Sequence, residues 1–242
     1  MQLVRSGPAG SAALELAVSH ALLTRVASGE LPPTLRIYRP APAVAFGKLD
    51  ALRPGYAAAV EAARSHDYEP VLRLPGGHAA AYHSQSLAID VVWALEDPVV
   101  GTHTRFAEEG ERLAGALRTL GVDARVGEVP GEYCPGAYSV NARGRVKLIG
   151  TAQRLVRHAA LLGASIVVGD GPGIRAVLDD VYAALEFPWD ATTAGAIDEE
   201  VPSVTLDAVE AAVLAAYGPL EPATLDGPTL ALAHRLAPQR AP

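Results

Sequence analysis

The chain has 242 residues, enough for one large domain or for one domain with an appendage, and for a core that needs no disulfides. Its net charge of −7 offers no basic surface of the kind that phosphate neutralisation requires, which argues against nucleic acid as a partner. The single cysteine excludes a disulfide framework, no apolar run approaches the roughly 20 residues that cross a membrane, and no leading basic-then-apolar signal is present; these features favour the cytoplasm.

The first predicted element is an amphipathic helix over residues 11–27. Apolar side chains recur there at spacings of three and four behind Ser11, a candidate N-cap. Two short segments of strand-type composition follow, LRIYRP (35–40) and PAVAFGKLD (42–50), and prolines separate them.

The middle of the chain is rich in predicted strands. Helical spacing returns over 54–65, and strand-like sequence then lies on both sides of a Pro-Gly-Gly turn between 71 and 90. A helix is predicted over 104–120. Between 122 and 168 short apolar runs alternate with turn residues, as in a series of strands, and residues 140–146 have the polar, glycine-containing tip of a hairpin.

The last part of the chain is again helical, with predicted helices over 174–185, 205–217 and 229–236. Helices at both ends around a strand-rich middle predict an α+β fold and not an alternating βαβ winding.

Common phosphate and metal signatures are missing. No Gly-x4-Gly-Lys-Ser/Thr motif occurs, and Gly76-Gly77-His78 does not complete a Gly-x-Gly-x-x-Gly motif that opens a helix. The seven histidines are scattered and one cysteine cannot build a zinc knot, so we predict no metal site.

A first candidate cluster surrounds the paired glycines between two strands. Gly76 and Gly77 let the backbone approach a ligand closely, and Arg73, His78 and His83 can supply charge or hydrogen bonds to a polar head group. On the residues alone, a glycine turn with solvated flanking side chains remains the alternative.

A second candidate cluster contains the only cysteine, in Gly131-Glu132-Tyr133-Cys134-Pro135-Gly136, and Lys147 thirteen residues later. A lone cysteine usually serves as a small buried hydrophobe. Cys134, however, lies beside a Pro-Gly pair with turn chemistry, which predicts a reachable loop position. Lys147 is one of only two lysines and lies among apolar residues, although an ordinary exposed strand lysine is the alternative.

The two residues suit each other chemically. Half ionisation of a thiol at neutral pH needs roughly 2 kcal/mol of help. An ammonium about 5 Å away, at an effective dielectric near 20, supplies roughly 3 kcal/mol. If the predicted hairpin folds Lys147 back toward Cys134, the lysine suffices to activate the thiol.

These clusters resemble the lipoate-protein ligase, octanoyltransferase and biotin-protein ligase family. The segment from Arg73 to His83 is similar to the family's glycine-rich ligand loop, Lys147-Leu148-Ile149-Gly150-Thr151-Ala152-Gln153 to its Lys-x-x-Gly-x-Ala-Gln strand, and Pro42 to Lys48 to a short strand that ends in Gly-Arg or Gly-Lys. Pro75, His78 and Ala80-Ala81 depart from the usual loop.

The resemblance implies a central mixed or antiparallel sheet flanked by helices, as in a biotin/lipoate protein ligase-like catalytic domain. That domain is expected over 1–200, with a short C-terminal helical extension over 201–242. Tyr133-Cys134-Pro135-Gly136 is most similar to the loop of the cysteine-dependent octanoyltransferases and amidotransferases. The implied catalytic residues are therefore Cys134, which takes the acyl chain as a thioester, and Lys147.

The resemblance also implies the remaining site residues and the partners. The expected acyl and substrate-binding residues are Arg73, Gly76, Gly77, His78, Ala79, Tyr82, His83, Gly150, Thr151, Ala152 and Gln153. The expected donor is an octanoyl- or lipoyl-bearing acyl-carrier protein or glycine-cleavage H-type protein, and the acceptor is a lysine of a lipoyl domain. No cofactor is expected.

Two other hypotheses stay open at this stage. An ATP-dependent lipoate-protein ligase would use ATP and Mg²⁺, with Lys147 and the glycine loop holding an acyl-adenylate. A non-catalytic relative would only bind an acylated carrier or a small acid. The sequence does not choose among donors, between octanoyl and lipoyl groups, or among oligomeric states.

Overall fold

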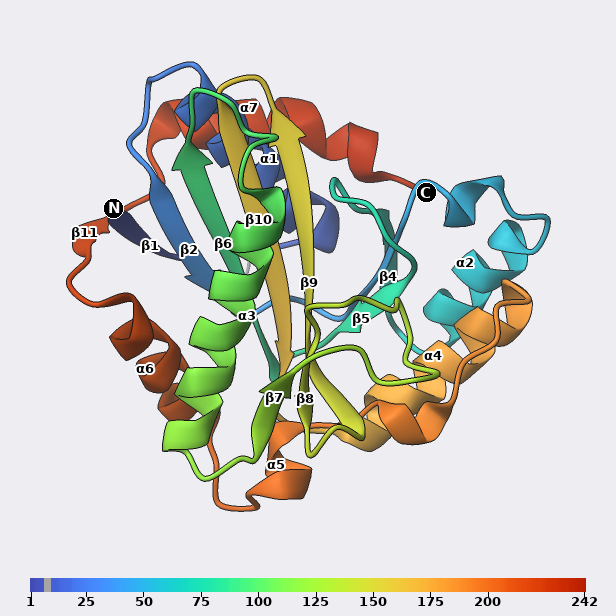
Figure 1. Ribbon diagram of the computed structural model, residues 1–242. Coiled ribbons are helices and arrows are strands. Elements are labelled where there is room, and N and C mark those ends of the chain that lie inside the picture. Colours follow the sequence, from blue (N-terminus) through green and yellow to red (C-terminus); the bar gives the residue numbers. More distant parts are fainter. Residues whose placement is uncertain (7–9) are drawn as a thin grey trace.

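Two sheets form the frame of the molecule in the computed structural model, which describes residues 1–6 and 10–242 (Figure 1). Within those residues the large sheet has eight strands, in the order β11 (Glu221–Ala223), β1 (Gln2–Ser6), β2 (Thr34–Tyr38), β6 (Ser86–Ala94), β10 (Ala159–Val167), β9 (Val146–Val156), β8 (Val140–Ala142) and β7 (Ala124–Val126). The small sheet has the order β4 (Glu69–Leu72), β3 (Ala43–Phe46) and β5 (Ala80–Tyr82). Parallel pairs (β1 with β2 and β11, β3 with β4) accompany antiparallel ones, so both sheets are mixed.

Helices cover both faces of the large sheet. The helices are α1 (Ala12–Ala27), α2 (Tyr56–Ser65), α3 (Thr102–Thr119), α4 (Gly171–Ala184), α5 (Ile197–Glu200), α6 (Leu206–Tyr217) and α7 (Gly227–Leu236). In Figure 1, α3 lies in front of the large sheet, with α6 packed beside it, while α1 and α7 lie behind. The pair α2 and α4 packs together on the side of the small sheet.

The pleat of the large sheet separates two cores. Val91 and Leu162 belong to the cluster with α3 and α6, whereas their neighbours Val92 and Leu161 pack with α1 and α7. Successive side chains of a strand point to opposite faces, so both central strands are mostly apolar on both faces, with Asp90 of β6 and Ser165 of β10 among the buried polar exceptions. The predicted α+β fold with a mixed sheet between helices is confirmed.

A bulge in β9 decides which side chains face α1. The pairing of β8 with β9 shifts between Val140 and Asn141, which lie opposite Ile149 and Lys147, so Leu148 is the extra residue. Leu148 and Ile149 both enter the α3 core as a result. Lys147 and Gly150 then face the same side, since a Cβ on Gly150 would lie 3.2 Å from Lys147 Cε. Bulges commonly re-aim side chains near functional sites.

The predicted elements are present, with bounds shifted by at most four residues. Ser11 caps α1 as expected by accepting the backbone N–H of Leu14. The hairpin tip expected over 140–146 connects β8 and β9. The short strand β1 and the edge strand β11 beside it were not predicted. In the expected C-terminal extension, α6 packs on α3, β11 pairs with β1, and α7 packs on α1.

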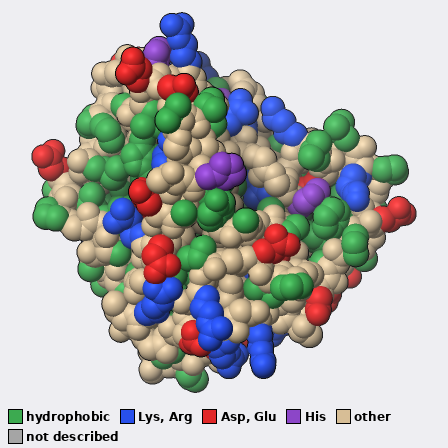
Figure 2. All heavy atoms as spheres, viewed as in Figure 1, with side chains coloured by type: hydrophobic (Ala, Val, Ile, Leu, Met, Phe, Trp, Pro, Cys, Tyr) green, Lys and Arg blue, Asp and Glu red, His purple; other side chains and the backbone are tan. Residues whose placement is uncertain are grey.

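The described residues form no large basic patch on the face drawn in Figure 2, in agreement with the net charge of −7. Basic and acidic side chains are interspersed on the face that Figure 2 shows, with apolar patches between them. Across residues 1–6 and 10–242, no helix combines the length and the apolar character that a membrane crossing needs.

Candidate active site

The loop that carries Cys134 folds around a buried carboxylate. Glu132 accepts the hydroxyl of Ser139 at 2.6 Å and the backbone N–H groups of Gly136 at 2.9 Å and Val129 at 3.3 Å. Cys134 itself has a φ of +42°, a left-handed conformation that is uncommon outside glycine and is typical of functional sites. The carboxylate therefore holds a strained loop with the thiol at its tip.

Lys147 reaches this loop from β9. Its ammonium donates to the carbonyls of Cys134 at 2.8 Å and Tyr133 at 3.0 Å and lies 3.3 Å from Glu132 Oε1. Burial lowers the pKa of Lys147, and the negative charges of Glu132 and Cys134 oppose that effect. An ammonium has three N–H donors, so this arrangement engages all of them with the cysteine loop.

Arg73 is the cation in contact with the thiol. Its Nη2 lies 3.1 Å from Cys134 Sγ, and the backbone N–H of His78 donates to the same sulfur at 3.3 Å. Burial alone would raise the pKa of Cys134, but Arg73 first and Lys147 second outweigh it, so the pKa lies below its usual value. The activation that the sequence argument assigned to Lys147 alone thus comes mainly from Arg73.

A glycine allows this close approach. Gly77 has a φ of +95°, and a Cβ at this position would lie 2.2 Å from Arg73 Nη2 and 2.9 Å from Cys134 Sγ. The next residue, His78, is anchored because its Nδ1 lies 2.8 Å from Asp50 Oδ1. The fully buried Asp50 also accepts the backbone N–H of Gly47 at 2.8 Å, so it ties two loops together under the thiol.

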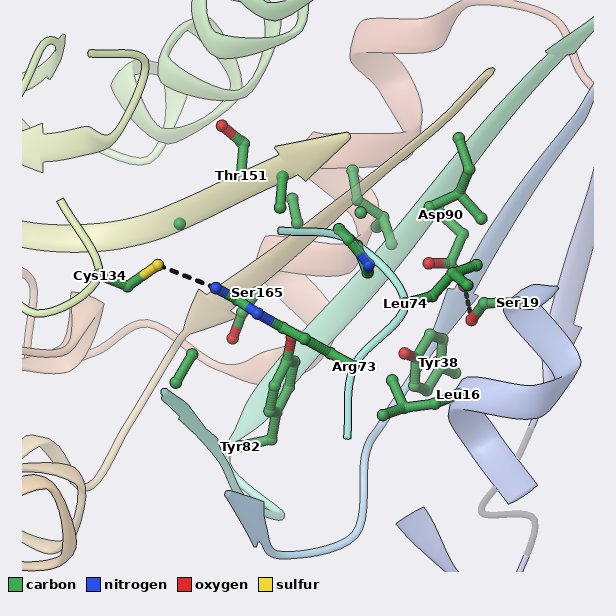
Figure 3. A pocket seen from close by; sticks show the side chains of 18 of the residues that line it. Leu16, Ser19, Tyr38, Arg73, Leu74, Tyr82, Asp90, Cys134, Thr151 and Ser165 are labelled. Atoms are coloured by element: carbon green, nitrogen blue, oxygen red, sulfur yellow. Dashed lines mark hydrogen bonds between the residues drawn. The ribbon is translucent and has the colours of Figure 1, made fainter. Parts of the chain in front are cut away.

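A pocket extends from Cys134 across the α1 face of the large sheet. Arg73 crosses it toward the sulfur, with Leu16, Ser19 and Asp90 at the far end (Figure 3). The lining residues are Leu16, Ser19, Tyr38, Arg73, Leu74, Pro75, Ala80, Tyr82, Ile89, Asp90, Tyr133, Cys134, Lys147, Gly150, Thr151, Ala152, Leu161, Gly163, Ala164 and Ser165. Most of these side chains are apolar or small, so the pocket suits a slender hydrocarbon chain.

The far end of the pocket rests on a buried polar cluster. Asp90 accepts the hydroxyl of Ser19 at 2.6 Å and lies 3.4 Å from the fully buried guanidinium of Arg36, which also contacts Glu15. Burial raises the pKa of Asp90, and Arg36 opposes this effect. The charged groups close the end of an otherwise largely apolar pocket.

The remaining expected site residues divide into three groups. Tyr82, Gly150, Thr151 and Ala152 line the pocket with Arg73, Cys134 and Lys147. Gly76, Gly77 and Gln153 line an adjoining groove that also includes Cys134 and Thr151, so they lie at the mouth. Ala79 and His83 line neither the pocket nor the groove: Ala79 packs in the core beside α4, and His83 has its ring nitrogens near Asp170, Gln85 and Ser86.

Several residues of the site were missed by sequence reasoning. Glu132, Asp50 and Tyr182 are buried groups that hold the loops, and Tyr182 accepts the N–H of Cys134 at 2.7 Å while donating to the carbonyl of Ala79 at 2.9 Å. Of these three, only Glu132 could have been found from the sequence, because it lies two residues before the cysteine. In the part of the chain that the structure describes, no group of three or more histidine, cysteine or acidic side chains could hold a metal ion.

Comparisons with known proteins agree with this architecture. A relative from Geobacillus kaustophilus, named octanoyl-[GcvH]:protein N-octanoyltransferase, is 27% identical over 71% of this chain and 60% of its own length. The octanoyltransferase LipM of Kyrpidia tusciae is 31% identical over 75% of this chain and 69% of its own. The chain thus spans less than two thirds of the first relative.

Solved structures give the same fold. A crystal structure of lipoate-protein ligase A bound with ATP superposes with a TM-score of 0.80 at 23% identity, covering 98% of this chain and 94% of that one. The family model of the lipoyl protein ligase A/B catalytic domain matches residues 11–217. The chain therefore belongs to the lipoyl protein ligase A/B catalytic domain family.

Proposed function

We propose that this protein is an acyltransferase that moves an octanoyl or lipoyl group to a lysine of a lipoyl domain through a thioester on Cys134. The observation that carries the proposal is the partly buried thiol with Arg73 Nη2 at 3.1 Å, at the end of a largely apolar pocket. A thiolate, and not a thiol, is the nucleophile that such a transfer needs.

The transfer balances in two half-reactions. The Cys134 thiolate attacks the acyl carbonyl of the donor, a C–S bond forms, the bond to the donor's nitrogen or sulfur breaks, and the leaving group takes up one proton. The acceptor lysine amine then attacks the thioester, a C–N bond forms, the thiolate leaves, and one proton is released. No oxidant, reductant or nucleotide enters this balance.

Burial of an eight-carbon acyl chain in the pocket would contribute to its binding free energy. At about 0.8 kcal/mol per buried methylene, an octanoyl chain contributes about 5 to 6 kcal/mol. Few polar contacts are then needed to hold the acyl group. The names of the relatives from Geobacillus and Kyrpidia point to octanoyl transfer, and the first names octanoyl-GcvH, so an acylated glycine-cleavage H protein is the donor to test first.

Intact mass spectrometry tests the proposal. The protein is mixed with octanoyl-GcvH or an octanoyl acyl-carrier protein, without ATP, and we expect one octanoyl adduct that hydroxylamine removes. Cys134→Ala should form no adduct and should lose transfer to a lipoyl domain, whereas Ser203→Ala, at an exposed position, should behave as the wild type. Full transfer by Cys134→Ala would refute the covalent route.

The two other hypotheses are decided in the same assay. Acylation of the lipoyl domain from free lipoate only when ATP and Mg²⁺ are added would identify a ligase. Binding of the acylated carrier without transfer under either condition would identify a non-catalytic relative.

A further inference from the structure

The edge of the Arg73 guanidinium that faces Cys134 carries two N–H donors, and only one of them has a hydrogen-bond partner among the described residues. Nη2 of Arg73 donates to the sulfur, but the buried Nε has no hydrogen-bond partner in residues 1–6 and 10–242. The Nε–H and Nη2–H bonds are parallel and lie on one edge of the guanidinium. This edge can donate two parallel hydrogen bonds to a pair of neighbouring acceptor atoms. An unpartnered buried donor is costly, and a bound acceptor accounts for it.

A second buried donor without a partner faces the same pocket. Ser165 of β10 is 6% exposed, and its hydroxyl has no hydrogen-bond partner in the described part of the chain. It lies opposite Gly150 in the ladder between β10 and β9, so the missing side chain of that glycine leaves space beside it. In Figure 3, Ser165 is drawn near the guanidinium end of Arg73, and both line the pocket.

The hydrogen-bond donors of Lys147 already have partners in the protein. Its three N–H donors face Glu132 and the carbonyls of Tyr133 and Cys134, so in this arrangement it holds the loop. A carbonyl oxygen attached to Cys134 must therefore find its donors on other groups.

We propose that Arg73 Nε and the Ser165 hydroxyl form the subsite that binds the carbonyl oxygen of the acyl group on Cys134. This inference rests on the proposed thioester. In a thioester, sulfur and oxygen are bonded to one carbon, as are the two oxygens of a carboxylate. The guanidinium edge can thus contact both atoms, Nη2 the sulfur and Nε the oxygen.

The same subsite would also stabilise the charge that develops during acyl transfer. When the donor or the acceptor amine reacts, the carbonyl oxygen gains negative charge. Arg73 keeps a full positive charge beside it, and Ser165 adds a neutral donor from a rigid strand. Donors fixed where charge develops stabilise the transition state more than the ground state. Ser165 is therefore assigned as a further catalytic residue.

The test begins with octanoyl-enzymes of the wild type, Ser165→Ala, Arg73→Lys and the control Ser203→Ala, each verified by intact mass. Infrared spectroscopy with a ¹³C-labelled octanoyl carbonyl then reports polarisation of the C=O bond. We expect the carbonyl stretch at a lower frequency in the wild type and Ser203→Ala than in Ser165→Ala and Arg73→Lys. The rate of acyl transfer from the isolated thioester should fall about 10- to 100-fold in Ser165→Ala.

The outcomes separate the two proposals. If the thioester forms in all proteins and its carbonyl frequency is unchanged in Ser165→Ala, the subsite is refuted and the thioester mechanism stands. If no thioester forms in the wild type, both are refuted. Should Arg73→Lys not fold, Ser165→Ala alone decides, because that change removes one oxygen and leaves the backbone unaltered.

Discussion

Charge at Cys134 comes from two cations with different tasks. Arg73 touches the sulfur directly, whereas Lys147 donates to the loop carbonyls and acts on the thiol from behind them. Both lower the pKa of Cys134 against the effect of burial, with Arg73 the larger of the two. The thiol of Cys134 therefore loses its proton at a lower pH in the folded protein than in the unfolded chain.

Because the pKa of Cys134 is lower in the folded protein, the free energy of unfolding depends on pH through this group. Since the folded pKa of Cys134 lies below the unfolded value of about 8.5, ionisation stabilises the fold fully above that value. The contribution is lost as the pH falls through the lowered folded pKa.

We expect Arg73→Met to slow alkylation of Cys134 at pH 7 by about tenfold or more, because burial then acts against fewer positive charges. The midpoint of the alkylation rate against pH should move to higher pH. Stopped-flow reaction with iodoacetamide measures both quantities. Arg143→Met, at the exposed hairpin tip, is the control, and an unshifted midpoint in Arg73→Met would show that Arg73 does not set the thiol pKa.

Gly77→Ala tests the close approach of the glycine loop. The new Cβ would displace the tip of Arg73 or the sulfur of Cys134, so we expect thiol alkylation and thioester formation to fall about tenfold. Both the contact and the positive φ predict a loss of stability of about 1 kcal/mol, which urea unfolding measures.

The control for backbone strain is Gly144→Ala. Gly144 has a φ of +72° with no atom within 4 Å of the added Cβ, so this variant carries the strain without the contact. It should lose only the stability that the positive φ costs and should keep the thiol reactivity. Equal reactivity in the two variants would remove Gly77 from the site.

The sequence predicted one site from Cys134, Lys147 and the Arg73 loop, and these residues lie together in the structure, but it did not predict which cation touches the sulfur. Arg73 and Cys134 are 61 residues apart, and their contact depends on a glycine conformation and on the anchor from Asp50. Asp50 belongs to no local pattern, because its contact with His78 forms only after two separate loops have met, whereas Glu132 bonds within the cysteine loop itself.

At the scale of elements, α4 joins the cysteine loop to the glycine loop through one side chain. The hydroxyl of Tyr182 accepts the N–H of Cys134 and donates to the carbonyl of Ala79, so one side chain links the cysteine loop to the chain that enters β5. The helix begins behind Asp170, whose side chain caps the N–H of Gly173.

Tyr182→Phe should therefore lower the free energy of unfolding by about 1 to 3 kcal/mol, since a buried N–H and a buried carbonyl lose their partner. Slower alkylation of Cys134 should accompany the loss. The matched control is Tyr56→Phe, because the buried hydroxyl of Tyr56 has no partner among the residues described and its ring belongs to the same core. Equal destabilisation by the two changes would contradict the linking role.

Element prediction failed where the elements are short or irregular. The strands β1 and β11 contain five and three residues and pair in parallel, so no hairpin turn marks them in the sequence. The bulge at Leu148 is also invisible in the sequence, although it turns Lys147 toward the pocket. The long helices α1 and α3 were predicted because their apolar spacing spans several turns.

At the scale of the whole molecule, the fold alone does not choose between a transferase and a ligase. The superposed ligase binds ATP on the same architecture, at 23% identity. The choice thus depends on the chemistry around Cys134. A ligase activates a free carboxylate, which is a poor electrophile, whereas a cysteine transferase receives an acyl group that is already activated.

We therefore expect transfer from octanoyl-GcvH to a lipoyl domain at the same rate with and without ATP and Mg²⁺, and equally after addition of EDTA. The reason is that in the proposed mechanism Cys134, with Arg73 beside its sulfur, attacks an existing amide or thioester, so no mixed anhydride has to form. Isothermal titration calorimetry with ATP, alone and with free lipoate, should show no tight binding, and a coupled assay should detect no pyrophosphate. Cys134→Ala serves as the control, since a ligase would keep its activity in that variant. Pyrophosphate release that depends on free lipoate and survives Cys134→Ala would establish the ligase and overturn the transferase.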